Sequence, residues 1–248
     1  MVERKSTVRT KSRTVAASAK RGGGIELYFK RIFALMFGAV GVTALAAFAT
    51  MATPLWGMLF TGTGMSVLFY ILMFGGMGVA IWAQTRAFAM KPAVAMGMLF
   101  LYAALLGIVL TPLLLLAVTQ NPFTILAAFV IAALMFACMA LFGYKTVKDL
   151  SFMRTFLFMG MIGLILVGLA SFIWPTLLGG TFGMIFCLIG VLVFALFTAY
   201  DMQMLKRAYA AVGDEYQKNQ LAVLGALHLY ISFVAIFQYV LALLNRNN

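Results

Sequence analysis

Seven apolar runs, each about 20 residues long, constrain this chain more than any other feature. They cover residues 32–52, 66–84, 92–112, 123–144, 155–174, 181–204 and 221–244. A helix of about 20 residues rises about 30 Å, which is the thickness of a bilayer's hydrocarbon core. The strands of an outer-membrane barrel are only ~10 residues long and alternate polar with apolar residues, which these runs do not. We therefore predict an all-α integral membrane protein with seven transmembrane helices.

Composition supports the same class. The chain is 65% hydrophobic and only 10% charged, whereas a soluble domain carries about 25% charged residues. A soluble fold of this size could not bury so much apolar surface, so lipid must cover the excess.

The basic residues indicate how the helices are oriented. All 18 Lys and Arg residues except Arg246 lie before the first run or in alternate connections, around residues 85–91, 145–154 and 205–220. The positive-inside rule then places the N-terminus and these connections in the cytoplasm. The net charge of +12 therefore reports topology and predicts attraction to anionic lipid, with no nucleic-acid partner.

Residues 1–24 form a separate, basic and Ser/Thr-rich segment that ends in glycines. Such a segment cannot build a core, so we predict a disordered cytoplasmic tail followed by a seven-helix membrane domain over residues 25–248. Its Arg/Ser bias is also typical of a transit peptide, so an organellar membrane stays open as an alternative location.

Asp201 is the one acidic residue inside a predicted span, about 7.5 Å of helix from the basic residues that follow it. An ionised carboxylate within a span costs a few kcal/mol, so such groups usually face the bundle interior and mark ion or proton pathways. The alternative is an interfacial carboxylate that simply reaches water. Its position alone leaves both interpretations open.

The seventh run contains the only histidine, His228, with Ser232 one turn later on the same helix face. A lone histidine is often only a packing residue, but its unperturbed pKa is the one closest to neutrality. We found no catalytic or metal-binding motif, so the chain is predicted not to be an enzyme and to hold no resident cofactor.

Three motifs resemble those of the Bax inhibitor-1 (transmembrane Bax inhibitor motif) family. They are "YKTVKDLSFM" from Tyr144, "AYDMQ" from Ala199 and "GALHLYISFVAIF" from Gly225, with a looser match at "LMFGAVGVTALAAFA" from Leu35. The Tyr-Asp-x-Gln form and the short loops resemble bacterial members, which implies a bacterial inner (plasma) membrane protein.

The resemblance implies six helices around a central C-terminal helix. It also implies a pH-sensitive calcium leak channel, controlled by two aspartates that share a proton. The first carries over to Asp201, which would also be a weak, transient calcium ligand, but Ser232 occupies the position of the second. Arg86 is the candidate for the family's basic latch onto the first aspartate.

Because a serine cannot share a proton as a second carboxylate does, we expect His228 to replace it as the partner of Asp201. Together these residues would sense pH and gate the passage of calcium or protons. The alternative implied by the resemblance is a regulatory membrane protein that binds a membrane-anchored ATP-dependent protease without conducting ions, with residues 1–24 as the active part.

Overall fold

The computed structural model describes residues 3–61, 64–86 and 89–246, and within these it describes no side chain for residues 3–23, 60, 61, 64 and 175. The elements are α1 (Glu3–Ala52), α2 (Leu55–Leu59), β1 (Phe60–Thr61), β2 (Gly64–Met65), α3 (Val67–Arg86), α4 (Pro92–Gln120), α5 (Phe123–Lys145), α6 (Met153–Ile173), the 3-10 turn η1 (Pro175–Leu178), α7 (Gly180–Ala211) and α8 (Glu215–Arg246). β1 and β2 form only a two-residue antiparallel ladder.

Seven of the helices are long and apolar enough to cross a bilayer: residues 24–52 of α1, and α3 to α8. The predicted all-α fold with seven membrane-spanning helices is confirmed. The third predicted run ends at Pro112, but α4 continues past this proline to Gln120. A continuous helix satisfies the hydrogen bonds of its own backbone, whereas a helix that ended within lipid would leave backbone groups without hydrogen-bond partners.

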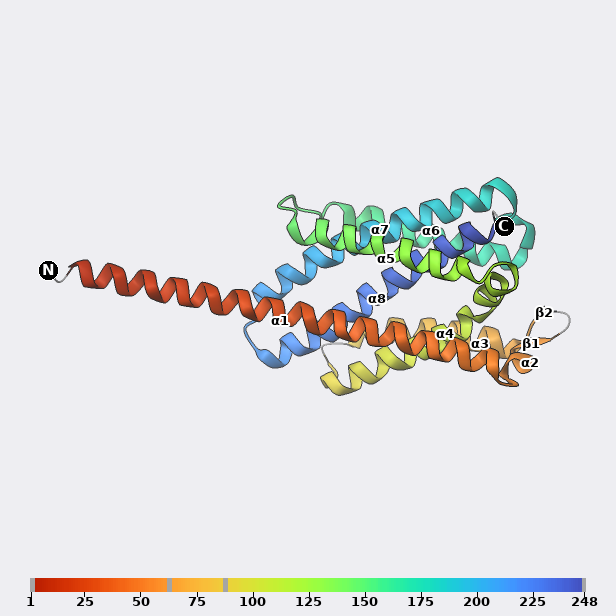
Figure 1. Cartoon of the computed structure of the whole chain (residues 1–248), viewed down its shortest axis with the longest axis horizontal. Helices are drawn as coiled ribbons and strands as arrows, with labels where there is room; N and C mark the ends of the chain where they lie inside the picture. Colours follow the sequence, from red (N-terminus) through yellow and green to blue (C-terminus); the bar gives the residue numbers. More distant parts are fainter. Residues whose placement is uncertain (1–2, 62–63, 87–88, 247–248) are drawn as a thin grey trace.

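The helices run between two distinct ends of the bundle (Figure 1). The connections α3–α4, α5–α6 and α7–α8 lie at the end toward the N-terminus, and we call this the basic end because it carries the clustered Lys and Arg residues. The hairpin of β1 and β2, η1 and the C-terminus lie at the opposite end. The first part of α1 extends beyond the basic end, so the structure continues one helix through the predicted tail and the first span. The division at residue 24 stays a prediction.

The core forms around α8, which is the most buried span. It packs against α1, α4, α5 and α7, and its buried residues include Ala226, Tyr230, Phe233 and Ile236. The helices α3 and α6 lie at the flanks, where α3 packs mainly on α4 and α6 mainly on α7. The finer expectation, that all six other spans surround α8, is not confirmed.

Candidate functional site

A cavity of about 830 Å³ lies between α3, α4, α6, α7 and α8. Its walls follow helical periodicity: Phe194, Phe197, Asp201 and Met204 share one face of α7, because their spacings of three and four residues bring them to one side. In the same way, α3 contributes one face from Leu72 to Thr85. The cavity therefore extends along the spans rather than across one end of them.

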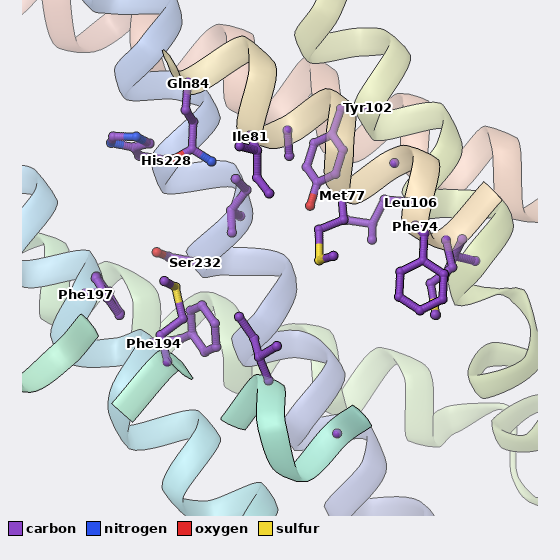
Figure 2. Close-up of a pocket in the computed structure, with 18 of the residues that line it drawn as sticks. Phe74, Met77, Ile81, Gln84, Tyr102, Leu106, Phe194, Phe197, His228 and Ser232 are labelled. Atoms are coloured by element: carbon purple, nitrogen blue, oxygen red, sulfur yellow. The ribbon is translucent and has the colours of Figure 1, made fainter. Parts of the chain in front are cut away.

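Most of the wall is apolar, and its few polar groups are distributed unevenly. Figure 2 shows Gln84 and His228 near one end and Phe74 at the other, with Met77 and Ile81 between them on α3. The polar and charged residues of the wall are Gln84, Thr85, Tyr102, Arg154, Tyr200, Asp201, His228 and Ser232. Gln84, Thr85 and Arg154 lie within the helix turns nearest the basic end.

Asp201 and His228 face each other in this cavity. The Nδ1 atom of His228 lies 4.0 Å from Oδ1 of Asp201, and the Asp201 residue is only 7% exposed. Nδ1 of His228 is buried and has no hydrogen-bond partner in the described part of the chain. The pair is thus one small side-chain movement from direct hydrogen bonding, and a proton could pass between its members.

Ser232 lies one turn beyond His228, is buried and lines the same cavity. The structure therefore brings together three of the four residues that the sequence predicted for the site. Arg86 ends α3 but does not line the cavity, and the ion pairs of the described residues include none between Arg86 and Asp201. Its role as a latch stays a prediction.

Arg154 also lines the cavity, and the sequence did not predict this cation as a site residue. It lies in the first turn of α6, with its guanidinium 6.0 Å from the centre of the Phe158 ring. Its sequence position after the motif loop gave no indication that it would line the same cavity as Asp201, since this depends on how α6 packs on α7.

Gln203, two residues after Asp201, fastens the α5–α6 loop to α7. Its amide nitrogen donates to the carbonyl oxygen of Lys148 at 2.8 Å, and its amide oxygen accepts from the backbone N–H of Leu150 at 2.9 Å. Both Gln203 and Leu150 are buried. The two motifs that contain Asp201 and the α5–α6 loop therefore form one unit, which motif spacing alone could not reveal.

Outside the spans, Asp149 and Arg207 strengthen the same connection. Arg207 donates to Oδ1 of Asp149 at 2.7 Å and to the hydroxyl of Ser151 at 3.3 Å. Hydrogen bonds from Ser151, and then the charge and hydrogen bond of Arg207, lower the pKa of Asp149 to about 2. Asp149 is therefore ionised at any physiological pH.

The site contains no ready-made metal centre. Among the described residues, no three His, Cys, Asp or Glu side chains are grouped so that they could hold a metal ion. A single carboxylate with neighbouring neutral oxygens fits a weakly bound, passing cation better than a resident one.

Comparison with known proteins gives a consistent match over the membrane domain. The family model described as "Inhibitor of apoptosis-promoting Bax1" matches residues 26–248. The chain is 30% identical to the inner membrane protein YbhL of Escherichia coli (strain K12) over 217 residues, which cover 86% of this chain and 89% of YbhL. It is also 30% identical to an uncharacterized protein of Rickettsia prowazekii over 90% of this chain and 91% of that protein. An uncharacterized membrane protein of Streptococcus pyogenes serotype M3 is 28% identical, over 91% of this chain and 95% of its own length.

Proposed function

This chain belongs to the Bax1-I family of inhibitors of apoptosis-promoting Bax1, and from that premise we propose that it is a pH-sensitive cation leak channel, permeable to calcium and gated through Asp201. The observation that carries the proposal is the buried carboxylate of Asp201, 4.0 Å from the His228 imidazole in a cavity between the spans. A carboxylate held there provides a negative site for a cation, and its charge depends on a nearby proton acceptor.

The cavity wall also carries charged, titratable and neutral polar groups other than this pair. Arg154 on α6 is positively charged, and Tyr102 on α4 and Tyr200 on α7 are the other titratable groups of the wall. The α3 face adds the neutral Gln84 and Thr85. Movement of Arg154 or Arg86 toward Asp201 would neutralise the carboxylate and close the cation site, which is how a latch would act.

We further propose that the protein is not an enzyme, that calcium is a transient ligand and that the basic end faces the cytoplasm of a bacterial inner membrane. The name of the relative YbhL, an inner membrane protein, and the clustering of basic residues at one end support this placement.

Calcium uptake into proteoliposomes tests the channel. We expect the wild-type protein to admit calcium and Asp201→Asn to lose most of this flux, because the amide keeps the shape but not the charge. Asp214→Asn is the matched control, since it removes an exposed carboxylate from the α7–α8 connection, and its flux should equal that of the wild type. Flux that is undiminished in Asp201→Asn would refute the channel proposal.

The second candidate is a regulatory protein that binds a membrane-anchored ATP-dependent protease. It is favoured by Ser232, which leaves the site with one carboxylate and a poorer fit to calcium. If the wild type conducts no calcium, co-purification of such a protease by the full chain, and its loss on removal of residues 1–24, would support this role instead.

A further inference from the structure

The cavity is open at its side, between α3 and α6. The two helices meet at the end away from the basic connections, where the rings of Tyr70 and Phe172 lie 5.7 Å apart in an edge-on contact. Closer to the basic end, several residues that line the cavity are also exposed at the surface, among them Met77 (45%), Ile81 (55%) and Ile165 (43%). Because these residues lie in spans, the opening faces the hydrocarbon of the bilayer rather than water.

The shape and chemistry of the wall suit an acyl chain. Along α3 the lining runs from Leu72 to Thr85, about 20 Å of helix, within a hydrocarbon core about 30 Å thick. Apart from the polar residues near the basic end, this wall offers side chains such as Phe74, Leu106 and Leu169. Water beside these apolar side chains would lack hydrogen-bond partners, whereas a lipid tail would remain in apolar surroundings.

One unpaired cation lies at the polar end of the opening. Arg154 is exposed, lines the cavity and makes no ion pair with any described residue. The neighbouring Lys206 and Arg207 are engaged with the carbonyl of Tyr144 and with Asp149. Arg154 lies in the first turn of its span, at the depth where lipid headgroups begin, and is therefore the cation of the cavity wall that is available to a phosphate.

We propose that this cavity is a binding site for an anionic phospholipid of the surrounding bilayer. One acyl chain enters between α3 and α6, and the phosphate binds Arg154. Lipid binding at this site does not require ion conduction, so this proposal is tested separately from the channel proposal. Its occupant would lie along the wall that contains Asp201 and His228, and so would limit access of water and cations to that pair.

Cross-linking in liposomes tests the site with the full chain. The probe is phosphatidylglycerol with a diazirine at the end of one acyl chain, compared with phosphatidylcholine carrying the same chain. Peptide mapping should find cross-links at Met77, Ile81 and Ile165, and more of them from the anionic lipid.

Two glycines of α6 provide a matched pair of variants. A Cβ atom added at either Gly163 or Gly168 meets nothing within 4 Å, but only Gly168 lines the cavity. Gly168→Leu should therefore abolish the cavity cross-links, while Gly163→Leu should keep them.

The headgroup contact has its own pair of variants. We expect Arg154→Gln to reduce the preference for phosphatidylglycerol over phosphatidylcholine roughly fivefold, which corresponds to about 1 kcal/mol per basic residue at a membrane surface. Lys148→Gln removes an exposed charge from the adjoining loop and should leave the preference unchanged.

The proposal is overturned if cavity cross-links are absent while outward-facing positions are labelled, or if Gly168→Leu leaves them intact. Equal labelling by both phospholipids, or labelling by a diazirine fatty acid alone, would also overturn it.

Discussion

The role proposed for Asp201 depends on one neighbouring side chain. A carboxylate within a span is costly unless something nearby stabilises it, and the described part of the chain offers His228 at 4.0 Å. The sequence predicted His228 as the partner of Asp201, and the structure places the two side chains 4.0 Å apart. The role of the pair in sensing pH stays a prediction, because proximity permits proton sharing without showing it.

Substitution of Ser232 tests what a second carboxylate would add to calcium binding. Ser232→Asp places a second carboxylate in the cavity that contains Asp201, and calcium binds better as anionic oxygens are added. We expect calcium to bind at least several-fold more tightly in detergent, as measured by calorimetry.

Ser232→Asn is the control, because it changes the size of the side chain without adding charge. If both variants bind calcium as the wild type does, the cavity does not present these side chains to a cation.

At the scale of elements, the α5–α6 loop and α7 behave as one piece. The amide of Gln203 satisfies one buried carbonyl and one N–H of that loop, so Gln203→Leu would leave both without partners. We expect a loss of about 1–3 kcal/mol in the free energy of unfolding, measured by denaturant titration in micelles. Gln217→Leu makes the same chemical change at an exposed position of α8 and should leave stability nearly unchanged; equal effects would show that the loop attachment is not what Gln203 provides.

The same loop cannot supply the predicted pH response. Because the pKa of Asp149 is lowered to about 2, its hydrogen bonds with Ser151 and its ion pair with Arg207 contribute stability above the ordinary carboxyl pKa of about 3.9. This stability is lost as pH falls toward 2. Between about pH 6 and pH 8 the charge of Asp149 is constant. Asp149→Asn should therefore keep the pH profile of calcium flux, and a flattened profile would move the sensor from the cavity to the loop.

Close helix packing depends on glycines that motif reasoning did not select. A Cβ atom at Gly143 of α5 would lie 2.1 Å from the backbone oxygen of Ala199 on α7. Gly143→Ala must therefore separate the two helices, and we expect it to destabilise the protein by about 1–3 kcal/mol, seen as a lower melting temperature. Gly163→Ala faces open space and serves as the control; equal melting temperatures would contradict this close approach.

At the scale of the whole molecule, the fold follows from hydropathy, whereas the cavity does not. The length of the apolar runs alone locates seven spans, because within lipid a chain has few other ways to make its backbone hydrogen bonds. The ends were less predictable. The helix α7 continues to Ala211, beyond the predicted end at residue 204, and there Lys206 bonds to the end of α5 and Arg207 to the α5–α6 connection.

Arg154 and Gln84 could not be assigned to the site from the sequence, since their place in it depends on how far α3 and α6 stand apart. Helix periodicity gives the face of each residue on its own helix but not the separation of two helices that pack on different neighbours. The family resemblance likewise pointed to Asp201 and Ser232, but not to Arg154, which lines the same cavity.

The central claim is that Asp201 and His228 act as one titrating unit, and the pH profile of calcium flux tests it most directly. Uptake would be measured between about pH 6 and pH 8, the range around the unperturbed histidine pKa, for the wild type, Asp201→Asn, His228→Ala and the double variant. We predict a pH-dependent flux in the wild type and a displaced pH profile in His228→Ala. Asp201→Asn and the double variant should share the same flat profile, because coupled groups do not act additively. An unchanged profile in His228→Ala, or a wild-type profile in Asp201→Asn, would contradict the account.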